Sequence, residues 1–144
     1  MADKRDTDQT QYHALLTSYE PAVQTDLPGV ECGIGWHDLL KAFLDRASGL
    51  ALPVGGTVTL QRIKEEFGEI RIYFRAEGLG DDAMNDLLAA AQIAGKASVV
   101  TCEECGRPGR LGAIQGNYAT LCDDHRAEME RRFKGSDERH SAAG

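Results

Sequence analysis

The sequence predicts an α+β fold in which helices pack on an antiparallel β-hairpin and a small metal-binding unit follows at the C-terminus. Two runs in residues 57–76 alternate apolar and polar residues and are rich in β-branched side chains, which is typical of strands with one buried face. Before and after these runs, apolar residues recur at helical spacing. Three cysteines and a histidine in residues 102–125 form two pairs, each with two residues between its members.

Three helices are expected in the first hundred residues. The first covers residues 12–19 and ends before Pro21, and the second covers residues 36–49, where Gly49 is a suitable C-cap. The third covers residues 81–97 and begins with two aspartates, which suit the positive end of the helix dipole. Its apolar stripe consists of Met84, Leu87, Leu88, Ala91 and Ala94. The segments between the first two helices are expected to be loop.

A hairpin is expected between the second and third helices. Its strands are residues 57–63 and 70–76, joined by a short turn. In the second strand, apolar residues at alternate positions should face the helices, whereas Arg71, Tyr73 and Arg75 lie between them. One face of the hairpin is therefore expected to be buried and the other exposed.

The chain is expected to form one integrated body with two short tails. Residues 1–11 and 135–144 are polar and are predicted to be disordered. Residues 12–100 form the α/β core, and residues 101–134 form the metal-binding unit. The predicted helix at 81–97 leads into this unit without a flexible linker, so the two parts should pack together.

One structural Zn²⁺ ion suits the candidate ligands, which are Cys102, Cys105, Cys122 and His125. Four protein ligands close a tetrahedron and leave no open position, which is typical of a structural site. The first pair lies on a glycine-containing turn, two short strands follow at 110–114 and 117–121, and the second pair begins the last helix. This order of knuckle, hairpin and helix predicts a treble-clef zinc finger.

Other chemistry at these cysteines agrees less well with the pattern. A redox C-x2-C pair would sit near the start of a βαβ unit, and a disulfide framework would be expected in an exported chain. A catalytic metal needs an open position and a nearby acid or base, and the nearest acids, Glu103 and Glu104, are expected to face solvent. The chain is therefore expected not to be an enzyme, and a metal-dependent nuclease-like enzyme is the weakest alternative.

Composition limits the partners and the location of the protein. The formal net charge is −7, with 42% hydrophobic and 27% charged residues, as in ordinary globular proteins. No apolar run approaches the roughly 20 residues that span a bilayer, and no apolar segment follows the charged N-terminus. We therefore expect a cytoplasmic protein without membrane association. An acidic chain without a basic stripe is not expected to bind nucleic acid non-specifically.

Two sets of residues nevertheless form candidate binding surfaces. On the exposed face of the hairpin, arginines alternate with an aromatic residue, which suits single-stranded nucleic acid, although nearby glutamates are typical of a merely solvated face. This hairpin set consists of Arg62, Arg71, Tyr73 and Arg75. A helix set consists of Arg126, Arg131 and Arg132. A nucleic-acid-binding zinc-finger protein is therefore the alternative to a protein-binding one.

Three residues near the start of the second helix have two interpretations each. Cys32 is interpreted as a buried or half-buried free thiol, with a metal ligand or a reactive thiol as the alternative. Trp36 is expected in the core, with a contact hot spot for a partner as the alternative. His37 is interpreted as a surface or packing residue that could instead pair with Cys32 or Asp38.

Three segments together resemble a known family. They are Cys32-Gly33-Ile34-Gly35-Trp36, Lys64-Glu65-Glu66-Phe67-Gly68 with its flanking strands, and Cys102-Glu103-Glu104-Cys105-Gly106-Arg107-Pro108-Gly109 with Leu121-Cys122-Asp123-Asp124-His125. In this order, over residues 31–130, they are similar to a family of small bacterial and phage proteins without an established activity. That family tends to have glycine at the place of Glu69. The resemblance implies one integrated α/β domain with a zinc finger, in a bacterial cell or a phage-infected host.

The function expected from these observations is that of a small zinc-stabilised binding protein. It would act through protein–protein interaction, for example as a phage-related regulator or inhibitor. The acidic core region and the absence of a catalytic residue set favour this prediction over the two alternatives.

Overall fold

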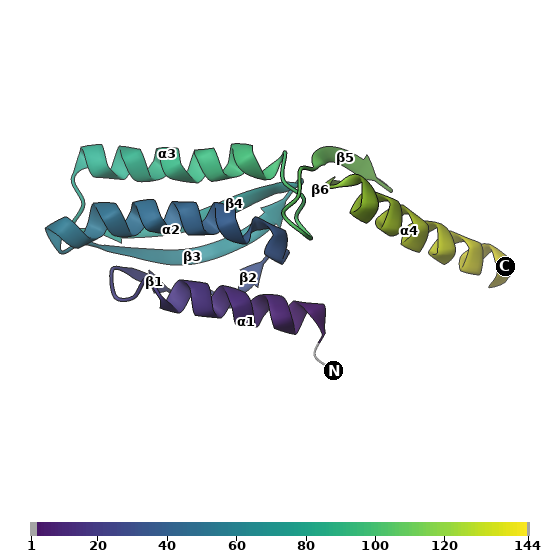
Figure 1. The fold of residues 1–144 in the computed structure, drawn as a ribbon, viewed down its shortest axis with the longest axis horizontal. Coiled ribbons are helices and arrows are strands. Elements are labelled where there is room, and N and C mark those ends of the chain that lie inside the picture. The colour runs from purple at the N-terminus through teal and green to yellow at the C-terminus, as the bar shows by residue number, and fades with distance from the viewer. Residues whose placement is uncertain (1–2, 144) are drawn as a thin grey trace.

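The structure, a computed structural model, describes the backbone of residues 3–143 and the side chains of residues 3–134. Its elements are, in order, α1 (Lys4–Thr17), β1 (Val23–Thr25), β2 (Val30–Glu31), η1 (Ile34–Trp36), α2 (His37–Ala51), η2 (Leu52–Val54), β3 (Thr57–Glu66), β4 (Glu69–Glu77), α3 (Asp81–Ser98), β5 (Arg110–Ile114), β6 (Asn117–Leu121) and α4 (Asp123–Ala143). Figure 1 shows α2 and α3 side by side along the sheet, α1 beside β1 and β2, and the β5–β6 hairpin with α4 at one end. The predicted α+β class is confirmed.

The four-stranded sheet is built around β3, its longest strand. On one side, β4 pairs antiparallel to β3, and a tight turn at Phe67 and Gly68 joins them with positive φ at both residues. On the other side, β1 and then β2 pair in parallel with successive parts of β3, with Val30 opposite Ile63. The predicted hairpin is present, but the sheet to which it belongs is partly parallel.

The loop predicted between the first two helices contains β1 and β2. These strands are three and two residues long, so they are too short to show an alternating pattern. The Gln9 side chain completes the pairing of β2, because it accepts from Val30 N at 3.0 Å and donates to Val30 O at 2.5 Å. A contact from α1 therefore supports an edge strand that the local sequence does not reveal.

The disordered tail predicted at residues 1–11 is wrong over residues 4–11, because α1 begins at Lys4 with Asp3 as its N-cap, and residues 1 and 2 lie outside the described part of the chain. The polar side chains of this segment find partners elsewhere in the fold. Asp8 is buried, accepts from Ile34 N at 3.3 Å and pairs with Lys4 at 3.0 Å. The first half of the helix is thus held by buried polar contacts, which a search for apolar periodicity does not detect, whereas Tyr12, Leu15 and Leu16 in its second half are buried at the predicted helical spacing.

Two helices extend beyond their predicted ends. α2 continues past Gly49 to Ala51, and the left-handed residue comes later, at Gly55 with φ +66°. The backbone of α4 continues to Ala143 through the tail predicted at 135–144. No proline interrupts this last stretch, and its glutamate, arginine and alanine residues favour helix.

The main core lies between the sheet and its helices. Trp36, Leu40 and Phe43 belong to one buried cluster with Leu60 and Ile63 of β3, and each of these side chains is at most 1% exposed. The aromatic and branched side chains of the α2 region are therefore the centre of the fold, and Trp36 takes its expected core position.

The predicted alternation along β4 is confirmed. Ile70 is buried, and Ile72 and Phe74 are partly buried against the core cluster, whereas the residues between them are exposed on the opposite face. One member of the predicted α3 stripe differs, because Leu88 is 46% exposed. The partial exposure of Ile72, Phe74 and Leu88 shows that the helices cover the β4 side of the sheet incompletely.

Candidate metal centre

The first pair of candidate ligands lies on a tight turn after α3. Gly106 N donates to Cys102 O at 2.9 Å, and Cys102 N donates to Arg107 O at 2.8 Å. Gly106 has a φ of +80°, which a residue with a side chain adopts only with strain. The closed turn brings the Cys102 and Cys105 thiols to the same side.

The second pair comes from the end of the β5–β6 hairpin and the first turn of α4. Cys122 follows β6 directly, and its carbonyl oxygen accepts from Arg126 N at 2.9 Å, which starts the helix that carries His125. Residues three apart lie on the same side of a helix. Cys122 and His125 therefore point together toward the first pair.

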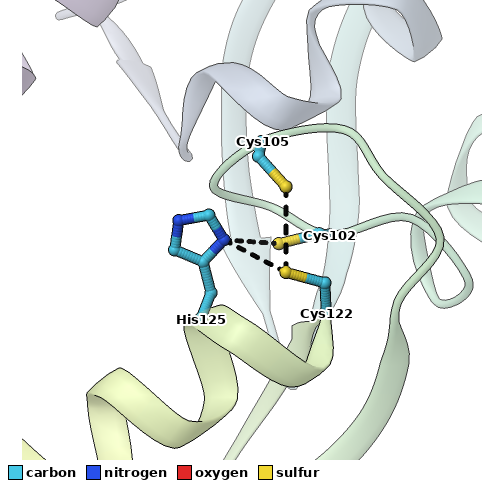
Figure 2. A group of neighbouring side chains, drawn as sticks. All are labelled: Cys102, Cys105, Cys122 and His125. Carbon is cyan, nitrogen blue, oxygen red and sulfur yellow. Dashed lines mark hydrogen bonds between the residues drawn. The ribbon is translucent and has the colours of Figure 1, made fainter.

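Figure 2 shows the four side chains converging on one point between the turn and α4. The Sγ atoms of Cys105 and Cys122 lie 3.8 Å apart, and His125 Nδ1 lies 3.2 Å from Cys122 Sγ and 3.6 Å from Cys102 Sγ. All four ligand atoms lie within 4.8 Å of one another. Ligands around one tetrahedral zinc-sized ion would be separated by about 3.5–3.8 Å. The four predicted ligands are thus close enough to hold a metal ion.

The Arg107 guanidinium supplies positive charge to this cluster. Its Nε donates to Cys105 Sγ at 3.2 Å, its Nη2 donates to Cys122 Sγ at 3.4 Å, and its Nη1 donates to Asp124 at 3.3 Å. Desolvation acts to raise the pKa of the Cys105 thiol, but the hydrogen bonds from Arg107 and the neighbouring groups outweigh it and lower the pKa to about 6. Because a metal binds the thiolate, Arg107 favours the form that ligates.

Two glycines before Trp36 allow the ligand turn to pack directly on the core. Gly35 N donates to Glu103 O at 2.7 Å, and Trp36 Nε1 donates to Thr101 O at 2.9 Å. A Cβ atom at Gly33 or Gly35 would lie too close to the Glu103 carbonyl oxygen for either contact to persist. The Gly-x-Gly-Trp segment is therefore a docking surface for the metal-binding turn.

Glu103 does not face solvent as predicted. It is half-buried against the segment before α2, and its Oε2 accepts from Gly33 N at 2.9 Å. Burial raises the pKa of this carboxyl to about 7, the Gly33 N–H opposes the rise, and the nearby Glu65 and Glu104 add to it. Glu104 is closer to its expected position, because it lies near the surface and pairs with Lys4 at 3.0 Å.

The hairpin set lies together on the open face of the sheet, but its arginines have acidic neighbours. Arg62 donates twice to Glu31, at 2.8 and 3.1 Å. Arg71 and Arg75 each lie near a glutamate two residues away on β4, at 3.5 and 4.0 Å, and Tyr73 is exposed between them. The face is therefore a mixed charged surface and not a basic stripe.

The helix set does not form one surface. Arg126 is only 5% exposed, and its Nη2 donates to Arg110 O at 2.5 Å and to Ala119 O at 3.2 Å. The prediction that Arg126 belongs to a binding surface is wrong, because its guanidinium joins the two strands of the β5–β6 hairpin to α4. Arg131 and Arg132 are exposed on α4.

The remaining residues near α2 have structural roles. Cys32 is a half-buried free thiol, as expected, and its Sγ lies 3.6 Å from the Tyr12 hydroxyl. Desolvation raises the pKa of Cys32 to about 12, which disfavours the thiolate that a reactive or ligating cysteine needs. His37 stacks on Tyr12, with ring centroids 6.1 Å apart, and lies 3.2 Å from Asp38.

Several residues that position the metal cluster are missing from the sequence-based prediction. Arg107 reaches the thiols of Cys105 and Cys122, and Thr120 links β6 to the β3–β4 turn through a 2.6 Å bond to Gly68 O. Neither residue belongs to a periodic pattern. The one available signal is the Gly-x-Gly spacing before Trp36, which is too short for a nucleotide-binding loop and fits a close approach of two backbones.

One structural finding and three comparisons with known proteins bear on how the site can be interpreted. In residues 3–143, no helix combines the length and apolarity needed to cross a membrane. No protein-family model, curated protein or solved structure matches the chain. The family resemblance of the three segments therefore stays a prediction.

Proposed function

We propose that this protein is a non-enzymatic, zinc-stabilised binding protein that acts through contact with another protein. The proposal rests on the closed ligand set, in which three thiols and one imidazole surround a single point (Figure 2). Zinc prefers these donors, and four protein ligands leave no position for water or substrate. Within the described part of the chain, no second group of His, Cys, Asp and Glu side chains is close enough to hold another metal.

The zinc ion would hold together the ligand turn, the β5–β6 hairpin and α4. Their order supports a treble-clef assignment. The apolar cluster of this unit is small, with four buried residues: Cys102, Ile114, Leu121 and Cys122. Metal binding in such units is worth on the order of 10–16 kcal/mol and is mostly folding free energy. The ion would therefore act as the main stabilising element of this end of the molecule.

The surface favours a protein partner over nucleic acid. The net charge is −7, the open-face arginines lie near glutamates, and Arg126 is buried. In addition, α2 and α3 form an apolar groove of about 480 Å³, which includes Leu39, Ala42 and the 67% exposed Ile93. Exposed apolar surface of this kind is typical of protein contacts, and Arg46, which also lines the groove, is paired with Asp86 at 3.1 Å.

Elemental analysis and two assays on the purified protein test this proposal. We expect one zinc per chain, no hydrolysis of nucleotides or nucleic acids, and no gel shift of DNA or RNA at about 50 mM salt. Turnover that disappears in a point variant would contradict the non-enzymatic assignment. Binding to nucleic acid that weakens steeply with salt would instead support the nucleic-acid-binding alternative.

A further inference from the structure

β4 forms an edge of the sheet, and half of its backbone groups point away from β3. The strand is nine residues long and pairs with β3 alone among the described strands. The two-residue turn makes Glu66 and Glu69 a hydrogen-bonded pair, so the odd-numbered residues of β4 bond to β3 and the even-numbered residues face outward. The bond from Ile70 N to Ser98 Oγ at 3.0 Å agrees with this pattern.

Side chains close the sheet edges at two places but leave the middle of β4 open. Ser98 Oγ accepts a hydrogen bond from the outward N–H of Ile70, and Gln9 bonds both backbone groups of Val30 on the opposite edge. In the described residues, no side chain bonds the outward backbone groups of Ile72, Phe74 or Ala76, and no strand pairs with them. An extended peptide is the partner that satisfies such a row of donors and acceptors.

The helix side of this edge requires apolar side chains from an added strand. Ile72 and Phe74 are only partly buried, and α3, which packs along β4, presents the 46% exposed Leu88 together with the partly buried Met84. Figure 1 shows α3 running along the β4 side of the sheet for the length of the strand. Alternate side chains of an added strand would lie between β4 and α3 and cover these apolar residues.

The open side of the edge requires an acidic side chain at its centre. The residue opposite Tyr73 in an added strand would have Arg71 and Arg75 as diagonal neighbours, within reach of long side chains at about 7–8 Å. Both guanidinium groups are well exposed, and their distances to Glu69 and Glu77, 3.5 and 4.0 Å, are those of loose ion pairs. A carboxylate between them would gain two charged partners.

We propose that the β4 edge binds an extended segment of a partner protein with an acidic residue between two apolar residues, the acidic one facing Tyr73. This inference rests on the proposed protein-binding function and specifies its site and ligand. A second copy of the chain is a poorer occupant. Strands pair about 4.8 Å apart, whereas packed helices need about 8–10 Å, so two copies joined through β4 would bring their α3 helices too close.

The probe is a fluorescein-labelled peptide, Lys-Val-Thr-Val-Glu-Val-Thr-Val-Lys, titrated into the zinc-loaded full chain. Its valines would face α3, its glutamate would face Tyr73, and its lysines would face Glu69 and Glu77. We expect saturable binding below about 1 mM by fluorescence polarisation. The peptide would add antiparallel to β4, so N-methylation of the two valines beside the glutamate should weaken binding at least tenfold, because in this orientation their N–H groups point to β4. N-methylation of the two threonines, whose N–H groups point away, is the matched control and should change it little.

A second test reverses the charges of the two arginines on β4. The Arg71→Glu, Arg75→Glu double variant should lose at least tenfold in affinity for the probe and should prefer a peptide with lysine in place of the central glutamate. The Arg131→Glu, Arg132→Glu variant makes the same change of charge on α4 and should bind as the unmodified protein does. Hydrogen exchange should show new protection at the Ile72, Phe74 and Ala76 amides when the probe binds.

Three outcomes would overturn the edge proposal. They are no binding at about 1 mM, equal effects of the two N-methylated peptides, and exchange protection located elsewhere, for example in the α2–α3 groove. In the last case the protein-binding function would stand and its site would be wrong. If sedimentation shows a dimer whose β4 amides are already protected without peptide, the occupant of this edge is a second copy of the chain and not a peptide. Failure of the proposed function itself is distinguishable, because it would appear as catalytic turnover or salt-dependent nucleic-acid binding.

Discussion

At Gly35 the fold has no room for any side chain. A Cβ atom there would overlap the carbonyl oxygens of Cys102 and Glu103, and these are backbone atoms that cannot rotate away. Gly49, in α2, has open space around its Cα instead. The two glycines therefore have opposite roles, since the first permits the approach of the ligand turn and the second only lowers helix propensity.

We expect Gly35→Ala to lower the free energy of unfolding by about 2–4 kcal/mol, because the ligand turn must move away from the core. Gly49→Ala is the control and should raise the free energy of unfolding by about 0.5–1 kcal/mol. Urea unfolding of the zinc-loaded variants measures both values. Equal stability of the two variants would show that the turn is not packed on this segment.

Arg107 is the residue whose charge reaches the thiols of Cys105 and Cys122. We expect Arg107→Ala to weaken zinc affinity by about tenfold or more, since a partner that orients and stabilises the thiolates is lost. Competition with a chromophoric chelator measures this affinity. Arg110→Ala removes the same charge from the same segment without touching a sulfur atom. A similar loss in that control would assign the effect to general electrostatics.

Glu103 makes the stability depend on pH. Its carboxyl pKa is about 7 in the fold against 4.5 for an exposed glutamate. The folded chain therefore keeps a proton that the unfolded chain loses, and the stabilisation present below pH 4.5 is lost as the pH rises through 7. Between pH 6 and 8, the free energy of unfolding of the unmodified protein should fall by about 1 kcal/mol relative to that of Glu103→Gln, whose side chain cannot ionise. If the difference in unfolding free energy between the two proteins is the same at both pH values, the buried position of this carboxyl is contradicted.

At the scale of elements, a buried arginine joins the β5–β6 hairpin to α4. The apolar contacts between them are few, with Met129 and Phe133 only partly buried against the small cluster. Arg126 bonds one carbonyl oxygen on each strand. The sequence assigns every arginine of α4 to the surface by default, because a buried guanidinium is rare and its partners are backbone atoms that leave no pattern.

Arg126→Met should lower the free energy of unfolding by about 2–3 kcal/mol, because it keeps the side-chain length and removes both hydrogen bonds from the guanidinium to Arg110 O and Ala119 O. Arg131→Met changes an exposed arginine in the next turn of the helix and should stay within about 0.5 kcal/mol of the unmodified protein. Thermal unfolding by circular dichroism measures both. A neutral Arg126→Met variant would show that the zinc ligands alone hold α4 to the hairpin.

At the scale of the whole molecule, the core and the metal-binding unit are joined by direct hydrogen bonds and have separate apolar clusters. Trp36 Nε1 bonds Thr101 O, and Thr120 Oγ1 bonds Gly68 O. The larger cluster covers α1 to α3 and the four-stranded sheet, and the smaller one contains two of the four candidate ligands, Cys102 and Cys122. Loss of the metal should therefore unfold one part and weaken the other.

Removal of zinc by a chelator, or Cys105→Ser, should unfold β5, β6 and the start of α4 while the four-stranded sheet persists. Hydrogen exchange should show lost protection over residues 101–134 and a smaller loss at the end of α3. Cys32→Ser is the matched cysteine control and should leave zinc content unchanged. Unchanged exchange after complete chelation would contradict the zinc assignment.

The local sequence by itself determined β3, β4, α2, α3, the β5–β6 hairpin and the four candidate ligands, because periodicity and ligand spacing are properties of neighbouring residues. Only the tertiary structure decided the rest. The first half of α1 depends on Asp8 and Gln9, β1 and β2 depend on β3, and the bond from Gly33 N to Glu103 joins residues 70 positions apart. A polar group becomes buried where a distant partner compensates its lost hydration, and such a pairing leaves no trace in the pattern of either segment.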